Sequence, residues 1–185
     1  MIRKILQSAI VVAGGLALGG CQLDQAKTTA PVVKPPAADY QAPVAASPPA
    51  TNIRGICYTP ADLATYRARM LQQEMVVATL QCQNPGGSRA YERQYGDFLA
   101  KFQSDLTANS RSLSQLGGRK RFNVDVLFTE FANRTAQRAP VDKEFCSRFK
   151  RSFDWALSAQ VTTIAQVPPP YDLGPEMNVF ACPSP

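Results

Sequence analysis

The chain contains no histidine, so the side chain that most often serves as a general base or metal ligand is missing. It also lacks the G-x-S-x-G, H-E-x-x-H and C-x-x-C-H motifs and the G-x-x-x-x-G-K-[ST] phosphate loop. No alternating run of β-branched residues is long enough to predict a sheet. These absences disfavour the hydrolase, metalloprotease, haem-binding and nucleotide-binding classes that depend on such motifs.

Proline is scarce in the middle of the chain and concentrated before it. The span 61–139 contains only Pro85, whereas residues 31–49 contain six prolines. Apolar residues make up 45% of the chain and charged residues 18%, which is ordinary for a globular protein. Because proline interrupts helices and strands, the contrast predicts a disordered or polyproline II tether over residues 21–56 and a folded body over 57–167.

The front of the chain has the features of a secretory signal peptide. Arg3 and Lys4 form a positive start, and Ile5 to Leu18 is apolar apart from Gln7 and Ser8. A membrane-spanning helix needs about 20 apolar residues, so this run is short for one. We therefore predict a removable signal peptide over residues 1–20.

The end of this segment carries a second motif. Leu18-Gly19-Gly20-Cys21 resembles the lipobox of bacterial lipoproteins. The resemblance implies that Cys21 receives a thioether-linked diacylglycerol and that its amino group is acylated after cleavage. Apart from these lipid groups, we expect no cofactor. The acylated Cys21 would bind the protein to the lipid bilayer, which is therefore its first expected partner. Gln22, in place of aspartate, implies the outer membrane, facing the periplasm of the bacterial cell envelope.

The body reads as four amphipathic helices separated by glycine and proline. We expect them at residues 60–82, 88–117, 123–137 and 142–167, with Thr59, Ser88 and Asp142 as caps. Short connections predict an all-α fold, an antiparallel up-down four-helix bundle, followed by an extended tail over 168–185. Stripes of Phe and Tyr along the helices are expected to form the core, although a ligand cleft is the alternative.

Four cysteines remain once Cys21 is assigned to lipid, and an even number in an exported chain predicts disulfides. A helix of about 22 residues spans about 33 Å, so Cys57 and Cys82 at its ends cannot pair. The up-down topology instead predicts Cys82 with Cys146 and Cys57 with Cys182. The spacing lacks C-x-x-C pairs, which disfavours zinc.

The densest cationic cluster is Arg119-Lys120-Arg121. Without Arg3 and Lys4 the chain has 18 basic and 14 acidic residues, a mild excess that favours anionic surfaces without requiring a nucleic-acid partner. We predict that the cluster contacts lipid head groups or another anionic envelope polymer. A solvated turn is the alternative.

Taken together, the sequence favours a membrane-anchored envelope lipoprotein that is not an enzyme but a structural, assembly or scaffolding accessory with an envelope protein partner. A small envelope-glycan hydrolase is one alternative, and its acids would be Asp125 with Glu130 or Asp142 with Glu144. The other alternative is a hydrophobic-ligand carrier that uses the aromatic interior.

Overall fold

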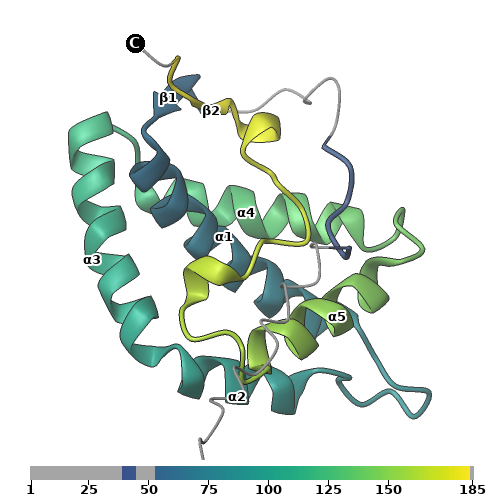
Figure 1. Cartoon of the computed structure of the whole chain (residues 1–185). Coiled ribbons are helices and arrows are strands. Elements are labelled where there is room, and N and C mark those ends of the chain that lie inside the picture. Colours follow the sequence, from purple (N-terminus) through teal and green to yellow (C-terminus); the bar gives the residue numbers. More distant parts are fainter. Residues whose placement is uncertain (1–38, 45–52, 184–185) are drawn as a thin grey trace, which may run out of the picture. The chain divides into compact units, whose positions relative to one another are not determined.

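Helices account for most of the regular structure, as the sequence predicts. A computed structural model describes residues 39–44 and 53–183 (Figure 1). Within these residues there are five α-helices rather than four: α1 (Pro60–Gln81), α2 (Glu92–Lys101), α3 (Gln103–Lys120), α4 (Val124–Arg138) and α5 (Phe145–Leu157). Four short elements complete the described part: β1 (Ile56–Tyr58), η1 (Ile164–Gln166), η2 (Pro175–Met177) and β2 (Val179–Ala181).

Helix α1 is the element around which the others pack (Figure 1). It begins as predicted, because the Thr59 hydroxyl accepts a hydrogen bond from the Asp62 amide at 3.2 Å and Pro60 occupies the first turn. It contacts α2, α3, α4 and α5. Buried side chains therefore lie on several sides of it, as expected of a helix enclosed by neighbours.

The single helix predicted over residues 88–117 is wrong, because two helices occupy this stretch. The chain leaves helical geometry at Phe102, whose ring is buried against that of Phe98 at a centroid distance of 5.1 Å. Ser88 caps nothing, since α2 begins at Glu92. A Cβ on Gly117 would lie 2.8 Å from the Val124 side chain, so this glycine permits close approach of α4 and does not end α3.

The fourth predicted helix is also shorter than expected. Helix α5 ends at Leu157, and Val161 and Ile164 are buried from a loop and from η1 instead. Asp142 lies before the helix and accepts a hydrogen bond from the Glu144 amide at 2.9 Å. The up-down four-helix bundle is therefore not confirmed, whereas a mainly helical fold is.

The tail is part of the core rather than an extended appendage. Strand β2 pairs with β1 in parallel, so Ile56 lies opposite Val179, and the two strands lie side by side in Figure 1. This small sheet was not predicted, because three-residue strands carry no periodicity. The side chains of Tyr171, Leu173 and Met177 are buried, and the Tyr66 hydroxyl donates to the Met177 sulfur at 3.3 Å.

Two disulfides connect distant parts of the described chain. Cys57 and Cys182 are joined with their Cα atoms 4.6 Å apart, and Cys82 and Cys146 with theirs 5.7 Å apart. These are the pairs predicted from the sequence. The pairs agree with the prediction although the up-down bundle from which they were derived is not confirmed, because α1 still separates Cys57 from Cys82 and the tail still returns to β1.

Part of the predicted tether is docked on the body. Tyr40 is 2% exposed, and its hydroxyl donates to the Pro168 carbonyl at 3.0 Å. Gln41 donates through its side chain to Pro169 at 3.1 Å, and the Ala42 amide donates to Pro170 at 2.8 Å. A tether disordered throughout is therefore wrong for residues 39–44. The signal peptide, Cys21 and the rest of the tether lie outside the described residues.

Candidate functional site

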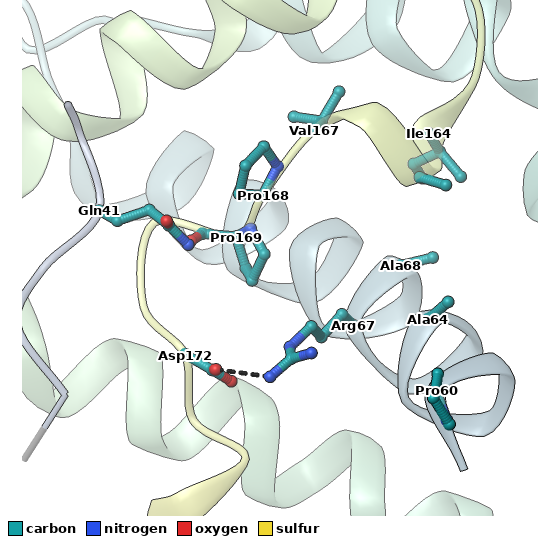
Figure 2. A pocket seen from close by; sticks show the side chains of 11 residues that line it. Gln41, Pro60, Ala64, Arg67, Ala68, Ile164, Val167, Pro168, Pro169 and Asp172 are labelled. Atoms are coloured by element: carbon teal, nitrogen blue, oxygen red, sulfur yellow. Dashed lines mark hydrogen bonds and ion pairs between the residues drawn. The ribbon is translucent and has the colours of Figure 1, made fainter. Parts of the chain in front are cut away.

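The first candidate is a cleft of 420 Å³ between α1, η1 and the proline-rich segment, which we call the proline cleft (Figure 2). Its lining includes Pro60, Ala64, Arg67, Ile164, Pro168 and Asp172. Figure 2 shows Arg67 reaching across to Asp172, and the guanidinium lies 2.8 Å from the carboxylate. Because the two charges neutralise each other, the cleft offers a ligand no uncompensated charge from this pair.

A group of charges is buried beside the tail. Glu74 is 0% exposed, and one of its carboxylate oxygens accepts the Tyr171 amide at 3.3 Å, while the other has no partner within the described residues. Burial raises the pKa of Glu74 well above its usual range, and the charge of Arg138 opposes this rise. Arg138 is itself paired with Glu176. The Arg138–Glu176 pair links the tail to α4, and the hydrogen bond from the Tyr171 amide to Glu74 links it to α1.

The acids proposed for a hydrolase are engaged in structural interactions. Asp142 and Glu144 both contact the Arg148 guanidinium, at 2.9 and 3.3 Å. Burial acts to raise the pKa of Asp142, but hydrogen bonds from Tyr171, the Glu144 amide and Arg148 outweigh it and lower that pKa. A carboxyl held ionised in this way is unsuited to act as a general acid.

The other acid pair fits catalysis no better. Asp125 is exposed in the first turn of α4, where a carboxylate complements the helix dipole. Glu130 lies 3.5 Å from Arg134, one turn further along the same helix. The hydrolase alternative therefore receives no support from these carboxylates. The aromatic interior likewise packs against itself, with Tyr66 and Phe131 ring centroids 4.9 Å apart.

The structure separates the three residues of the predicted basic cluster. Arg119 pairs with Asp62 at 2.9 Å. The Lys120 ammonium donates to the Cys57 carbonyl at 2.9 Å and lies 5.5 Å from the centre of the Tyr58 ring. Of these three residues, only Arg121 has an exposed side chain with no hydrogen bond or ion pair to another described residue. Arg119 and Lys120 thus attach the end of α3 to the start of α1 and to β1. The side chain of Arg121 remains available to bind a ligand.

Arg121 lines a second cleft, of 280 Å³, which we call the arginine cleft. It lies between the segment entering β1 and the junction of α3 with α4, and its lining includes Arg54, Tyr58, Arg121, Phe122, Val126 and Leu127. Arg54 was not predicted as a functional residue. It stands alone within a segment assigned to the tether, so no local pattern marks it.

Arg121 also adopts an unusual backbone conformation. It ends α3 with φ of 57°, in the left-handed region where glycine is normally found. We predict that Arg121→Gly raises the free energy of unfolding by about 0.5–1 kcal/mol, because an L-residue is strained there. Urea denaturation would measure the change.

Arg121→Ala is the matched control, because it removes the side chain and keeps the strain. Its stability should remain within about 0.5 kcal/mol of the parent chain, as for surface substitutions in general. A glycine variant no more stable than the alanine variant would contradict the argument from strain.

These features define a mainly helical body, joined by two disulfides, with surface clefts and buried ion pairs. The chain matches no protein-family model, no curated protein and no solved structure. Across residues 39–44 and 53–183, no group of three or more acidic or cysteine side chains is arranged to hold a metal ion. None of the helices in this part combines the length and apolar composition needed to cross a bilayer.

Proposed function

We propose that the protein is a lipid-anchored component of the bacterial cell envelope whose helical body serves as a non-enzymatic assembly or scaffolding accessory. The observation that carries this proposal is the pair of disulfides, Cys57–Cys182 and Cys82–Cys146. Disulfides of this kind persist in oxidising compartments such as the periplasm. An exported chain is what the lipobox-like Leu18-Gly19-Gly20-Cys21 also implies.

The anchor and the body are related through a short stretch of chain. Residues 22–38 separate Cys21 from the first docked residue, Asp39. At the polyproline II rise of about 3.1 Å per residue, a stretch of this length reaches on the order of 50 Å. A body on such a tether meets partners near the bilayer, whether these are embedded in it or stand beside it. Gln22 favours the outer membrane facing the periplasm.

A scaffolding role agrees with how the body uses its charges. Asp142, Glu144 and Arg148 hold one another in place near residues 39–44, where Arg148 also donates to the Tyr40 carbonyl at 3.2 Å. Arg138 and Glu176 do the same for the tail. Interactions of this kind specify a fixed shape, which an assembly accessory requires, and they leave these carboxylates unsuited to acid–base chemistry.

The test is the intact mass of the full chain isolated from the envelope. We expect a mass that begins at Cys21, increased by a diacylglyceryl and an N-acyl group and decreased by two hydrogens for each disulfide. In the Cys21→Ser variant the lipid increments should be absent and the protein should leave the membrane fraction, because the acyl chains supply the attachment. A parent chain without fatty acid would overturn the anchor.

The scaffolding part is tested separately on the same membranes. After cross-linking in intact cells, we expect the parent chain to capture one envelope protein reproducibly, and the Cys21→Ser variant to capture it less. Absence of any reproducible partner would overturn scaffolding while leaving the lipid anchor in place.

A further inference from the structure

The arginine cleft has no part in the function proposed above, yet its composition is that of a binding site. Its floor is apolar, with Tyr58 and Leu127 almost fully buried and Phe122 partly buried against them. Val126 lies at its edge and is 44% exposed, one of five large hydrophobic side chains in the described chain with that much exposure. An apolar hollow bordered by an exposed apolar residue favours an apolar ligand group.

The rim of the same cleft carries charge of one sign. Arg54 and Arg121 are both exposed, and neither has a hydrogen bond or ion pair with another described residue. They come from segments far apart in the sequence and are brought together only by the fold. By contrast, Arg67, Arg119 and Arg148 each contact a carboxylate. The positive charge of the rim is therefore uncompensated by such pairs.

The charged residues around the cleft do not cancel the positive charge of its rim. Lys120 lies over the ring of Tyr58, which lines the cleft. Among the acids close in sequence to the cleft residues are Asp62, which already pairs with Arg119, and Asp125, which is exposed in the first turn of α4. The amides of Asp125 and Val126 are bonded to the Asn123 side chain, so they are not free for a ligand.

We propose that the arginine cleft binds a single-chain anionic amphiphile, specifically a fatty acid. Its acyl chain occupies the hollow formed by Tyr58, Phe122 and Leu127, and its carboxylate lies between Arg54 and Arg121. A guanidinium is suited to this role, because it donates two parallel hydrogen bonds to a carboxylate. A free phosphate would leave the apolar floor uncovered. This inference does not depend on acylation of Cys21.

The experiment uses the full chain in membranes with a neutral lipid composition and a twelve-carbon fatty acid that carries a photoreactive diazirine. After irradiation, we expect the label on peptides that contain residues 53–58 and 121–127. Laurate should compete for labelling, whereas dodecanol and dodecylamine at the same concentration should not. At sub-saturating probe, Arg54→Gln and Arg121→Gln should each reduce the labelling of these peptides about 10-fold, because each removes a charge-assisted contact.

Two further variants keep the test independent of folding. Val126→Glu places an acid at an exposed edge position and should abolish labelling, because it repels the carboxylate. Arg89→Gln removes another exposed arginine, outside the cleft, and should leave labelling unchanged. Equal competition by dodecanol, labelling spread evenly over the surface, or loss of labelling in Arg89→Gln would overturn the proposal. So would a chain labelled only when the membrane contains anionic lipid, since that indicates a membrane-facing surface and not a cleft.

Discussion

Replacing Cys57 and Cys182 together with alanine should lower the free energy of unfolding by about 4–5 kcal/mol. The disulfide closes a loop with a sequence separation of 125, and cross-linking so long a loop removes much of the entropy of the unfolded chain. It also links Cys57, in β1, to the residue directly after β2, and these are the only two strands in the described chain. Urea denaturation of the oxidised parent and the double variant measures the difference.

The matched control is the Cys82→Ala, Cys146→Ala double variant, whose disulfide spans a separation of 64. The chain-entropy account predicts a loss of about 4 kcal/mol here, slightly less than for the other pair. The two variants should differ more clearly in which segment of the folded protein unfolds locally. Hydrogen exchange of residues 171–183 should accelerate when the Cys57–Cys182 bond is absent and change little when the other is. Equal exchange of the tail in both variants would contradict its attachment through Cys182.

The parts of the fold that were predictable are those fixed by local chemistry. Thr59 caps α1 as predicted, because a short polar side chain before an apolar run satisfies the first free amides. Asn123, which caps α4, was predicted only as the start of that helix. The length of α1 excluded only the pairing of Cys57 with Cys82, and the choice between the two remaining arrangements came from the up-down topology. The break at Phe102 was not predictable, because the apolar spacing continues across it and only the packing of its ring shows where the axis changes.

Long-range contacts explain the other differences. Gly117 reads as a helix terminator in sequence, yet the structure uses it for close approach to Val124. The tail reads as proline-rich and extended, yet its carbonyls accept hydrogen bonds from Tyr40 and Gln41 more than a hundred residues earlier. Of the arginine cleft, the sequence marked Arg121 through its basic neighbours. Arg54 lines the same cleft from the segment just before β1. Its place there could not be predicted, because three-residue strands carry no periodicity from which the sheet could be recognised.

Glu74 shows how a residue that a sequence pattern passes over can control stability. It lies in α1 next to the buried Met75, on a face that the tail covers. Its carboxyl receives one amide hydrogen bond, from Tyr171, and desolvation is the main cause of its raised pKa. Because the folded state holds the proton more tightly than the unfolded state does, the folded state is disfavoured once the unfolded chain begins to lose that proton.

The parent chain should therefore lose stability as the pH rises from the ordinary carboxyl value of 4.5 toward the raised pKa of Glu74. The pKa of Asp142 is lowered from its ordinary value of 3.8, so its contribution to stability is lost as the pH falls below that value. The effects of Glu74 and Asp142 on stability therefore occupy different pH ranges. In Glu74→Gln the loss above 4.5 should disappear. This variant should be about 1–3 kcal/mol more stable than the parent at pH 7, because it removes the cost of burying a carboxyl that the unfolded chain keeps ionised at that pH.

Glu74→Met separates the charge from the hydrogen bond. It has no ionisable group, so it should also lack the loss of stability above pH 4.5, but it leaves the Tyr171 amide without its acceptor. We expect it to be about 1–2 kcal/mol less stable than Glu74→Gln at every pH. Urea denaturation of the three chains between pH 4 and 8 measures both effects. A glutamine variant that retains the pH slope of the parent would show that another group, and not Glu74, sets the stability of the body in this range.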